Sequence, residues 1–490
     1  MKTNTLDFDA QALRERILDL AMRGKLVPQD PNDEPAIVLL EKIKAEKEEL
    51  VKEKKIKKSK PLPAITDDEK PFDIPDSWEW VRLGDVFDIT SSKRVMKSEW
   101  REEGIPFYRA REIVSIKNHQ KLKDPIFISK DTYEEKLKVS GRPQVDDILL
   151  TGVGTLGIPY VVSTNKDFYF KDGNIIWLRN IKKINPDFIS YYVQSPYMLK
   201  IINNGRGTTV ATLTIVRAKS LLVPLPPLSE QSRIAAKIAQ LFALLRKVES
   251  STQQYAELQT LLKSKVLDLA MRGKLVKQDP NDEPASVLLE KIKAEKAELI
   301  KEKKIKKSKP LPPITDEEKP FDIPDSWKWV RISDVLDVRD GTHDTPKYVA
   351  DGIPLITSKN ISNGKLDFTN INFISKDDFE KINERSKVDK GDIIFAMIGT
   401  IGNPVLVDTD TKFSIKNVAL LKHFTDKLNM DFILDYLLVL QVIWNSNATG
   451  AVQKFVSLRK IRKSVLPLPP FKEQKKIVRK IDQIFRMIGE

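Results

Sequence analysis

A long internal repeat constrains the architecture of this chain more than any other feature. Residues 18–86 and 267–335 align without a gap, and only nine of their 69 paired positions differ. Beyond these residues the similarity ends almost at once, although two short motifs still correspond: GVGTLG to MIGTIG, and LPPLSEQ to LPPFKEQ. Drift after a simple duplication would blur both halves evenly. We therefore expect one scaffold, present twice, that carries two different domains.

The repeat divides the chain into five segments. A chain of 490 residues is too long for a single hydrophobic core. The predicted segments are the N-terminal half of a constant helical region (1–73), a first variable domain (74–226), a central constant helical region (227–322), a second variable domain (323–468) and a C-terminal constant helix (469–490).

A long helix is predicted in the central constant region. Residues 229–272 carry apolar side chains at spacings of three, four or seven, which is typical of a coiled-coil seam. Ser229 is its expected N-cap and Gly273 its expected stop. The predicted seam consists of Ile234, Ile238, Leu241, Leu245, Val248, Tyr255, Leu258, Leu262, Val266 and Leu269.

The two termini each supply part of the same helix. The N-terminus contains only its last part, from about Asp9 to Arg23, and the C-terminus contains only its first part. We expect the termini to lie close together and to rebuild a second rod, antiparallel to the first. The result would be a circular molecule with a pseudo-twofold axis.

A shorter helix follows the long one in each copy. In the central copy it begins at Pro284 and is expected to continue to the proline-rich break at residues 310–314. Its predicted apolar stripe is narrow, and the lysine cluster at 301–309 lies at its end. These lysines could bind phosphates, but a solvated charged face is the favoured interpretation. The stripe consists of Val287, Leu288, Ile292, Leu299 and Ile305.

Composition limits the chemistry that the chain can perform. The net charge of +14 makes a polyanion the first partner to consider. The absence of cysteine excludes disulfides and thiolate sites, and only three histidines occur, without an HExxH motif. No apolar run approaches the length of a membrane span, and no signal peptide is recognisable, so we expect a cytoplasmic protein. We predict no catalytic residue and no metal site.

Two motifs need an interpretation before catalysis is set aside. The glycines of GVGTLG are typical of a tight turn, since no Walker lysine follows them. The NPDF sequence at Asn185–Phe188 is faintly similar to the NPPF signature of adenine methyltransferases, but a capped helix start is the simpler interpretation. The tryptophans of the two IPDSWxWV motifs are expected to anchor the cores of the variable domains.

Clusters of polar residues distinguish the variable domains from one another. Arginine, lysine, asparagine, glutamine, serine and threonine on loops are the side chains that contact phosphates and base edges. Any one of them is more simply an ordinary surface residue, so the prediction depends on the clusters recurring in both domains. The candidate DNA-binding residues are Ser92, Lys93, Arg94, Arg109, Arg111, Arg142, Arg206, Thr208 and Thr209 in the first domain, and Arg339, Thr342, His343, Thr345, Lys347, Ser358, Lys359, Asn360, Lys416, Asn417, Gln453 and Lys454 in the second.

These features together resemble the specificity (HsdS) subunits of type I restriction-modification enzymes. The resemblance covers the whole chain and rests on the paired helix starts LPPLSEQSRIAAKI and LPPFKEQKKIVRKI, the two IPDSWxWV motifs, the GVGTLG and MIGTIG turns, and DGTHDTPKY. The duplicated LDLAMRGKLV block is similar to the branch of this family with long internal repeats. The C-terminal helix is short by comparison, which leaves open how completely the second rod is rebuilt.

The resemblance implies an α+β fold in which two α/β target-recognition domains are separated by long antiparallel coiled-coil-like helices. Each domain would read one half of a bipartite, asymmetric site in double-stranded DNA, with the rod setting the gap between the halves. It also implies two modification subunits that methylate adenine with S-adenosylmethionine, and two restriction subunits that use ATP and Mg²⁺. This chain itself would hold no cofactor and catalyse no reaction.

Two other function classes remain open at this point. The chain could be a non-catalytic protein-interaction scaffold whose basic charge is incidental. It could also be a single-chain methyltransferase or nuclease. Binding of S-adenosylmethionine, or DNA cleavage, by this chain alone would favour the enzyme, whereas sequence-specific and salt-dependent DNA binding would favour a specificity subunit.

Overall fold

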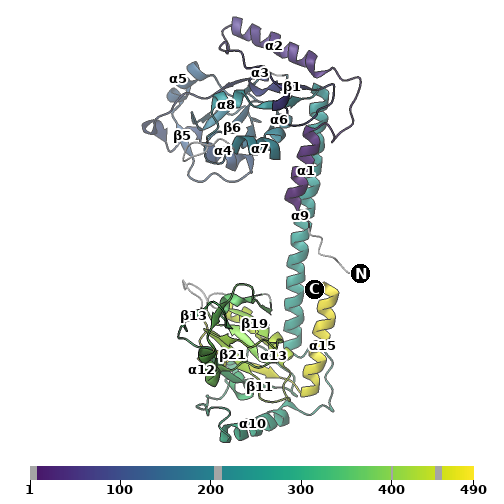
Figure 1. The fold of residues 1–490 in the computed structure, drawn as a ribbon, viewed down its shortest axis with the longest axis vertical. Helices are drawn as coiled ribbons and strands as arrows, with labels where there is room; N and C mark the ends of the chain where they lie inside the picture. The colour runs from purple at the N-terminus through teal and green to yellow at the C-terminus, as the bar shows by residue number, and fades with distance from the viewer. Residues whose placement is uncertain are drawn as a thin grey trace. The chain divides into compact units, whose positions relative to one another are not determined.

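The computed structural model describes residues 8–181, 183–203, 212–362, 364–398, 401–446 and 455–489. The chain forms two compact units that divide within helix α9 (Leu228–Met271), where one ends at Thr252 and the other begins at Gln253. Each unit contains one variable domain, one copy of the repeated helices and one part of α9 (Figure 1). No helix in the described ranges is both long and apolar enough to cross a membrane.

The first unit builds its variable domain from two four-stranded sheets. One is antiparallel, in the order β2-β9-β6-β7, and the other has the order β3-β5-β4-β8 with β4 and β8 parallel. Strands β1 and β10 pair where the domain meets the helices. The strands are β1 (Glu79–Arg82), β2 (Phe87–Thr90), β3 (Trp100–Arg101), β4 (Ile105–Tyr108), β5 (Ile126–Ile128), β6 (Ile148–Thr151), β7 (Pro159–Val161), β8 (Tyr169–Phe170), β9 (Ile175–Asn180) and β10 (Leu222–Leu225).

Helices surround these sheets, and the two helices of the repeat precede them. The indole N–H of Trp78 donates to buried Glu230 at 2.9 Å, which ties the domain to the start of α9. Trp78 is also buried in the hydrophobic core of this unit, which confirms its predicted anchoring role, whereas Trp80 is half-buried. The helices are α1 (Ala10–Met22), α2 (Ala36–Lys52), α3 (Leu83–Val86), α4 (Ala110–Lys117), α5 (Lys130–Ser140), α6 (Pro186–Val193), α7 (Pro196–Asn203) and α8 (Ile215–Lys219).

The second unit repeats this topology with a different sequence. Its sheets have the orders β12-β21-β18-β19 and β13-β17-β14-β20, with β14 and β20 parallel, and β11 pairs with β22. A small hairpin, β15–β16, is added. The strands are β11 (Lys328–Arg331), β12 (Asp337–Asp340), β13 (Tyr348–Val349), β14 (Ile353–Ile356), β15 (Ile361–Ser362), β16 (Lys365–Leu366), β17 (Asn372–Ile374), β18 (Ile393–Ala396), β19 (Gly402–Leu406), β20 (Ser414–Ile415), β21 (Val418–Lys422) and β22 (Val465–Leu468).

The contacts between helix and domain recur in the second unit. Trp327 donates to buried Glu473 at 3.0 Å, as Trp78 does to Glu230. The prediction of two similar α/β domains on a repeated scaffold is therefore confirmed. The helices are α10 (Ala285–Lys301), α11 (Ile332–Val335), α12 (Lys376–Ser386), α13 (Met430–Ser446), α14 (Leu458–Lys463) and α15 (Phe471–Ile488).

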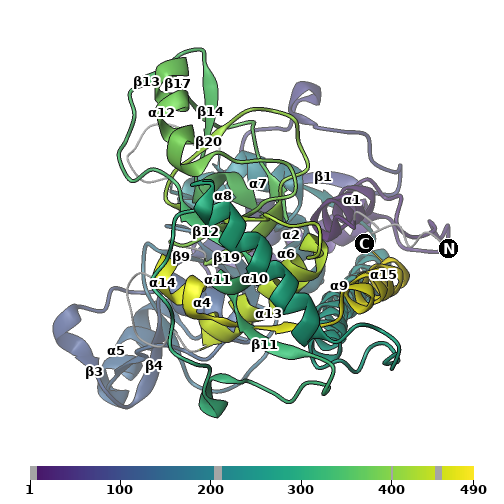
Figure 2. The same cartoon turned by 90° about the horizontal axis from the view of Figure 1, so that it is seen from below.

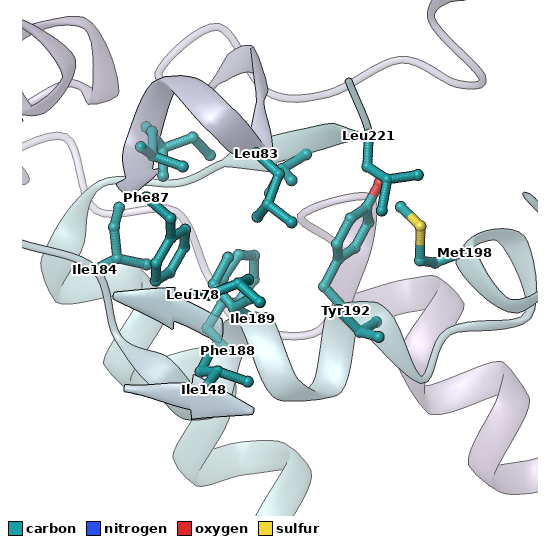
Figure 3. Close-up of a cluster of buried hydrophobic side chains, with 14 of the residues drawn as sticks. Leu83, Phe87, Ile148, Leu178, Ile184, Phe188, Ile189, Tyr192, Met198 and Leu221 are labelled. Carbon is teal, nitrogen blue, oxygen red and sulfur yellow. The ribbon is translucent and has the colours of Figure 1, made fainter. Parts of the chain in front are cut away.

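Each unit has its own hydrophobic core, and that core includes the repeated helices. In the first unit, side chains from α3, β6, β9 and α6 meet around Phe87, Phe188 and Tyr192 (Figure 3). Ile234 and Ile238 of α9 join this core, while Val266, Ala270 and Met271 join the core of the second unit. The two ends of α9 thus belong to two different cores.

Helix α9 agrees with the prediction at its C-terminal end and differs at its N-cap. Gly273 has a φ of +67° and ends the helix, with Lys274 N–H donating to the carbonyl of Leu269 at 2.8 Å. Ser229 does not cap the helix, which already begins at Leu228 after two prolines. Its hydroxyl lies near Asp33, whose pKa is lowered chiefly by the hydrogen bond from Arg233 and to a smaller extent by this hydroxyl.

The predicted seam of α9 is buried at its ends and exposed in its middle. In the first unit, α1 runs antiparallel to α9, with Arg14 paired to Glu249 and Gln29, just beyond α1, bonded to Glu230 (Figure 1). In the second unit, α15 ends against α9 where Gln259 donates to the carbonyl of Ile488. Because these partner helices are short, seam residues in the middle of α9 stay exposed, namely Val248, Tyr255, Leu258 and Leu262.

The structure confirms that each terminus supplies part of a rod. Helix α1 begins after its N-cap Asp9, and α15 runs beside α9 in both views of the second unit (Figures 1 and 2). Each packs antiparallel to α9 within its own unit. The proximity of the termini, and the circular pseudo-twofold arrangement, stay predictions.

The second repeated helix is shorter than predicted. Helix α10 ends at Lys301, nine residues before Pro310, and its C-terminus is closed by hydrogen bonds from Lys303 to Ile300 and from Lys304 to Leu299. Lysines three and four residues apart would repel one another on a continued helix, because residues at that spacing are neighbours on its surface. The lysine cluster is therefore a separate segment rather than a helical face, and the predicted extension of the helix is wrong.

Candidate nucleic-acid interface

Three polar segments converge at one edge of the second variable domain. Strands β14 and β20 are parallel, so their carboxyl ends meet, and Lys416 N–H donates to the carbonyl of Ile356 at 2.9 Å. The loop after β12 joins them, because Asn417 N–H donates to the carbonyl of Thr342 at 3.2 Å. We call residues 340–347, 357–360 and 416–417 edge 2.

His343 is held in place at the centre of edge 2. Its Nε2 lies 2.8 Å from Asp340 Oδ2, and its Nδ1 lies 3.2 Å from Asn417 Oδ1. Burial alone would raise the pKa of Asp340, but hydrogen bonds from Arg385 and His343 outweigh burial and lower this pKa. The carboxylate is therefore ionised and keeps the imidazole ring oriented toward Asn417. Lys416 Nζ donates to Thr345 Oγ1 in the same cluster.

The candidate residues of the second domain differ in how free their side chains are. Lys347 and Lys359 are exposed and form no ion pair or hydrogen bond with a described residue. Asn360 is buried, and its amide group bonds Thr357 and two loop carbonyls. Arg339 is engaged with Asp337 and with the carbonyls of Arg385 and Lys304. Asn360 and Arg339 therefore hold the loops, and the two lysines extend into solvent.

The remaining candidates of this domain lie in two places. Ser358 is half-buried beside Lys359, and Thr342 Oγ1 donates to the carbonyl of Asp344 at 3.4 Å. Gln453 and Lys454 lie outside the described residues.

The first domain has an edge in the corresponding place. Strands β4 and β8 are parallel, and Lys171 N–H donates to the carbonyl of Tyr108 at 2.8 Å. The loop after β2 joins them through Ser92, whose hydroxyl donates to the carbonyl of Phe170 at 2.6 Å. We call residues 91–94, 109–111 and 171–172 edge 1.

Edge 1 is strongly basic and is organised by acidic side chains. Arg109 and Arg111 both pair with buried Glu112 at 2.6 Å. Burial alone would raise the pKa of Glu112, but hydrogen bonds from the two arginines outweigh burial and lower it. Arg94 pairs with Asp172 at 3.0 Å, while the side chain of Lys93 is exposed and forms no ion pair with a described residue. Both edges thus present cations on a framework of ionised carboxylates.

The structure does not bring every candidate of the first domain to edge 1. Arg142 follows α5 and pairs with Asp167 at 3.2 Å, in a separate part of the domain. Arg206, Thr208 and Thr209 lie outside the described residues.

Two motifs have the structural roles that the sequence analysis favoured. The GVGTLG sequence forms the turn between β6 and β7, where Gly154 and Gly157 have φ angles of +80° and +73°. Asn185 caps α6 by accepting a hydrogen bond from the N–H of Phe188 at 3.0 Å. No cluster of metal-ligating side chains occurs among the described residues.

Comparison with known proteins assigns both variable domains to one family. The family model described as the type I restriction modification DNA specificity domain matches residues 75–259 and 324–489. The chain belongs to the type I restriction-modification specificity subunits. It recognises DNA sequence through its two specificity domains, and edges 1 and 2 lie within the two matched stretches.

Relatives of the specificity-subunit family match over most of the chain. The specificity subunit of type I restriction enzyme EcoAI from Escherichia coli is 31% identical over 98% of this chain and 89% of the relative. The EcoEI specificity subunit from Escherichia coli is 34% identical over 67% of this chain and 62% of the relative. A solved structure concerned with complex assembly and conformational transition of the type I R-M system has a similar fold, with a TM-score of 0.56, 21% identity, and coverage of 85% of this chain and 92% of that one.

Several residues of this specificity subunit's edges were not predicted from its sequence. Arg385 pairs with Asp340 from 45 positions away, and Glu112 and Lys171 complete edge 1. Only the parallel pairing of short strands brings these segments together, and two-residue strands leave almost no periodicity in a sequence. Glu112 alone had a local signal, since it stands three residues after Arg109 at the start of a helix.

Proposed function

We propose that edge 1 and edge 2 each read one half of a bipartite, asymmetric site in double-stranded DNA. The observation that carries this proposal is that both domains place their polar loops at the same strand ends, on the same topology, with different side chains. Two different surfaces at equivalent positions suit a site whose halves differ. Lys93, Lys347 and Lys359 are exposed cations that form no ion pair with a described residue, and His343 is the oriented polar group that could contact a base edge.

The continuous helix α9 is proposed to set the spacing between the two halves. Its 44 residues join the two cores without a break. A helix of this length extends on the order of 65 Å at about 1.5 Å per residue. Inserting one helical turn into its exposed middle is expected to change the spacer length that the complex accepts.

The repeated helices are proposed to dock two modification subunits, with two restriction subunits completing the complex. Two identical partners need two equivalent docking surfaces, and the repeat supplies them. Exposed apolar residues in the middle of α9, which lie outside the repeat itself, also favour a protein partner. They are Leu244 and Val248 in the first unit, and Tyr255, Leu258 and Leu261 in the second.

The chain is proposed to be non-catalytic by itself and to hold no cofactor. The partner subunits would use S-adenosylmethionine, ATP and Mg²⁺. If the chain were instead a protein-interaction scaffold with incidental charge, its DNA binding would show neither a sequence preference nor a steep dependence on salt.

DNA binding by the purified, assembled complex distinguishes these functions. A specificity subunit is expected to give a strong preference for one sequence and an affinity that falls steeply as salt rises, because phosphate contacts release counterions. Binding that lacks both properties would leave only the scaffold. Binding of S-adenosylmethionine, or DNA cleavage, by this chain alone would contradict the non-catalytic role.

A further inference from the structure

The same lysine-rich segment follows the second repeated helix in both units. Residues 54–60 and 303–309 have identical sequences, and none of the nine differences between the two repeats falls within them. We call them basic segment 1 and basic segment 2. Each contains five exposed lysines, and a single glutamate, Glu53 or Glu302, directly precedes each segment.

Most of these lysines have no acidic partner among the described residues. Lys55 pairs with Glu53 at 2.8 Å, and Lys304 pairs with Glu302 at the same distance. The other lysines form no ion pair with a described residue; they are Lys54, Lys57, Lys58 and Lys60, and Lys303, Lys306, Lys307 and Lys309. Each segment therefore concentrates unneutralised positive charge on a short stretch of chain.

The first lysine of each segment occupies a position that favours glycine. Lys54 and Lys303 have φ angles of +58° and +59°, in the left-handed region at the end of a helix. Helices α1 and α9 end with the same hydrogen-bond pattern, and there the residue is Gly24 or Gly273. A side chain in this region costs about 1 kcal/mol. Both copies of the second repeated helix carry a lysine at this position, and helix α4 carries His119 at the equivalent position with a φ of +53°.

The basic segments are fixed to their domains rather than free. Ile305 is buried among exposed lysines, and its N–H donates to the carbonyl of Leu299. Downstream, Arg331 donates to the carbonyls of Pro312 and Pro313, and the first unit repeats this contact between Arg82 and Pro63. A segment held at both ends loses little conformational entropy when it binds.

Each basic segment lines a cavity on its own domain. Basic segment 2 contributes Lys303, Lys304, Lys306 and Lys307 to a cavity of about 470 Å³. The rest of its lining includes Arg339 and Arg385 together with the carboxylates of Asp337, Asp340 and Glu384, so cations remain in excess. Figure 2 shows α10 lying across this unit beside α11. Basic segment 1 contributes to a cavity of about 900 Å³ that is also lined by Lys44, Lys47, Lys52 and Lys219 and by the carboxylates of Glu48 and Asp85.

Basic segment 2 is in direct contact with the framework of edge 2. Arg339 Nη2 donates to the carbonyl of Lys304 at 3.4 Å. Arg339 Nη1 donates to the carbonyl of Arg385, and the guanidinium group of Arg385 pairs with Asp340. In the first unit, Lys47 beside basic segment 1 donates to the carbonyl of Phe87, the first residue of the strand that leads into edge 1. The segments therefore adjoin the domains whose edges are proposed to read DNA.

We propose that the two basic segments bind DNA phosphates without regard to sequence, next to each half-site. This inference rests on the proposed DNA-reading function and adds a second type of contact to it. Identical lysine segments suit the backbone, which is the same at both halves, whereas the differing edges suit the bases. Lysines with flexible, unneutralised ammonium groups are point-charge ligands for phosphate.

The test compares two triple variants of the full chain in the assembled complex. In the first, Lys303, Lys306 and Lys307 are changed to glutamine. In the control, Lys291, Lys293 and Lys301 of the neighbouring helix α10 are changed to glutamine; these are exposed but ion-paired with Glu283, Glu290 and Glu298. Both variants lose three positive charges, so a general charge effect would be equal in the two.

The measurement is the slope of log affinity against log salt, on DNA with and without the recognised sequence. The first variant is expected to reduce the slope by about 0.9 for each phosphate that the complex no longer binds, to weaken binding on both DNAs by a similar factor, and to leave the recognised sequence unchanged. The slope of the control is expected to differ from the wild-type slope by less than about half of the change expected for one phosphate.

Three results would overturn the inference. Equal slopes for wild type and both variants would show that these lysines do not contact phosphates. A change in the recognised sequence would show that they contact bases. Weaker assembly with the partner subunits, at an unchanged slope, would assign the segments to an acidic protein surface. If the wild-type complex itself shows no sequence preference, the proposed function fails instead, so the two failures are distinguishable.

Discussion

The two variable domains share a framework and differ at their edges. Both have the same strand orders, and both are joined to the helices by a tryptophan that donates to a buried glutamate. At the edges, however, the first domain presents arginines around Glu112, and the second presents a histidine bound between Asp340 and Asn417. The contrast indicates that the repeated sequence specifies where the proposed recognition surface lies, and that the variable sequence specifies its side chains.

Exchanging one domain for a copy of the other would test this contrast most severely. Replacing residues 324–468 with residues 75–225 keeps the closing strand pair and the helical contacts, because β1–β10 and β11–β22 are equivalent. We expect the complex to lose its asymmetric sequence and to recognise two copies of one half-site. Specific binding exceeds non-specific binding by roughly 1,000-fold or more, so the change is expected to be complete. Sequencing of methylated sites measures it, and retention of the original sequence would refute the division of labour.

Removing one tryptophan tests whether the two units have independent cores. Trp327→Ala deletes a buried side chain and leaves Glu473 without its indole partner, and such core truncations cost about 3–5 kcal/mol. Hydrogen exchange is expected to lose protection in the second unit and to retain it in the first. Trp78→Ala is the matched control and is expected to show the reverse. Equal loss in both units would contradict separate cores.

One position at the helix contact differs between the units and predicts a pH effect. In the first unit, Tyr191 packs edge-on against Phe242 of α9 with ring centroids 5.8 Å apart. The corresponding residue on α13 is Asp435, and its burial, together with Asp482 and Asp431, raises its pKa to about 8. Because the folded-state pKa lies above the unfolded value, this group makes the fold less stable as pH rises from about 4 to about 8.

Asp435→Asn is therefore expected to stabilise the second unit, and the gain is expected to grow with pH. At about 1.4 kcal/mol per pKa unit, a shift from about 4 to about 8 sets an upper limit of about 5 kcal/mol on this gain at pH 8, and solvent screening keeps the gain below that limit. Thermal unfolding at pH 5 and pH 8 measures it, with Tyr191→Phe as a control that lacks a titrating carboxyl. A gain of the same size at both pH values would show that the carboxyl does not titrate in this range.

The sequence predicted the repeated framework well because its signals are local. The long helix was recognisable from its apolar spacing and from Gly273, and the anchoring tryptophans from their repeated motif. The end of α10 was missed because lysine has a good helix propensity. Repulsion among the lysines and the burial of Ile305 favour a helix that ends at Lys301 instead.

The edges were predicted only in part, because they are assembled from distant segments. Lys416 and His343 were recognised as candidates, but their contacts depend on a parallel pair of two residues between β14 and β20. Arg385 was not recognised, since it lies at the end of a polar helix and reaches the edge through one ion pair. Asn360 is a residue type that can contact bases, but its side chain is buried and hydrogen-bonds loop carbonyls instead.

The assignment of one half-site to each edge is tested most directly by two small variants and one measurement. Lys347 and Lys359 are changed to alanine at edge 2 in one chain, and Lys93 and Arg94 are changed to alanine at edge 1 in another. Each chain is expressed with its partner subunits, and the methylated sequences in the genome are determined. We predict that each variant relaxes or alters recognition of one half of the sequence only, and that the two variants affect opposite halves. Equal loss at both halves, or the same half affected by both variants, would contradict the account.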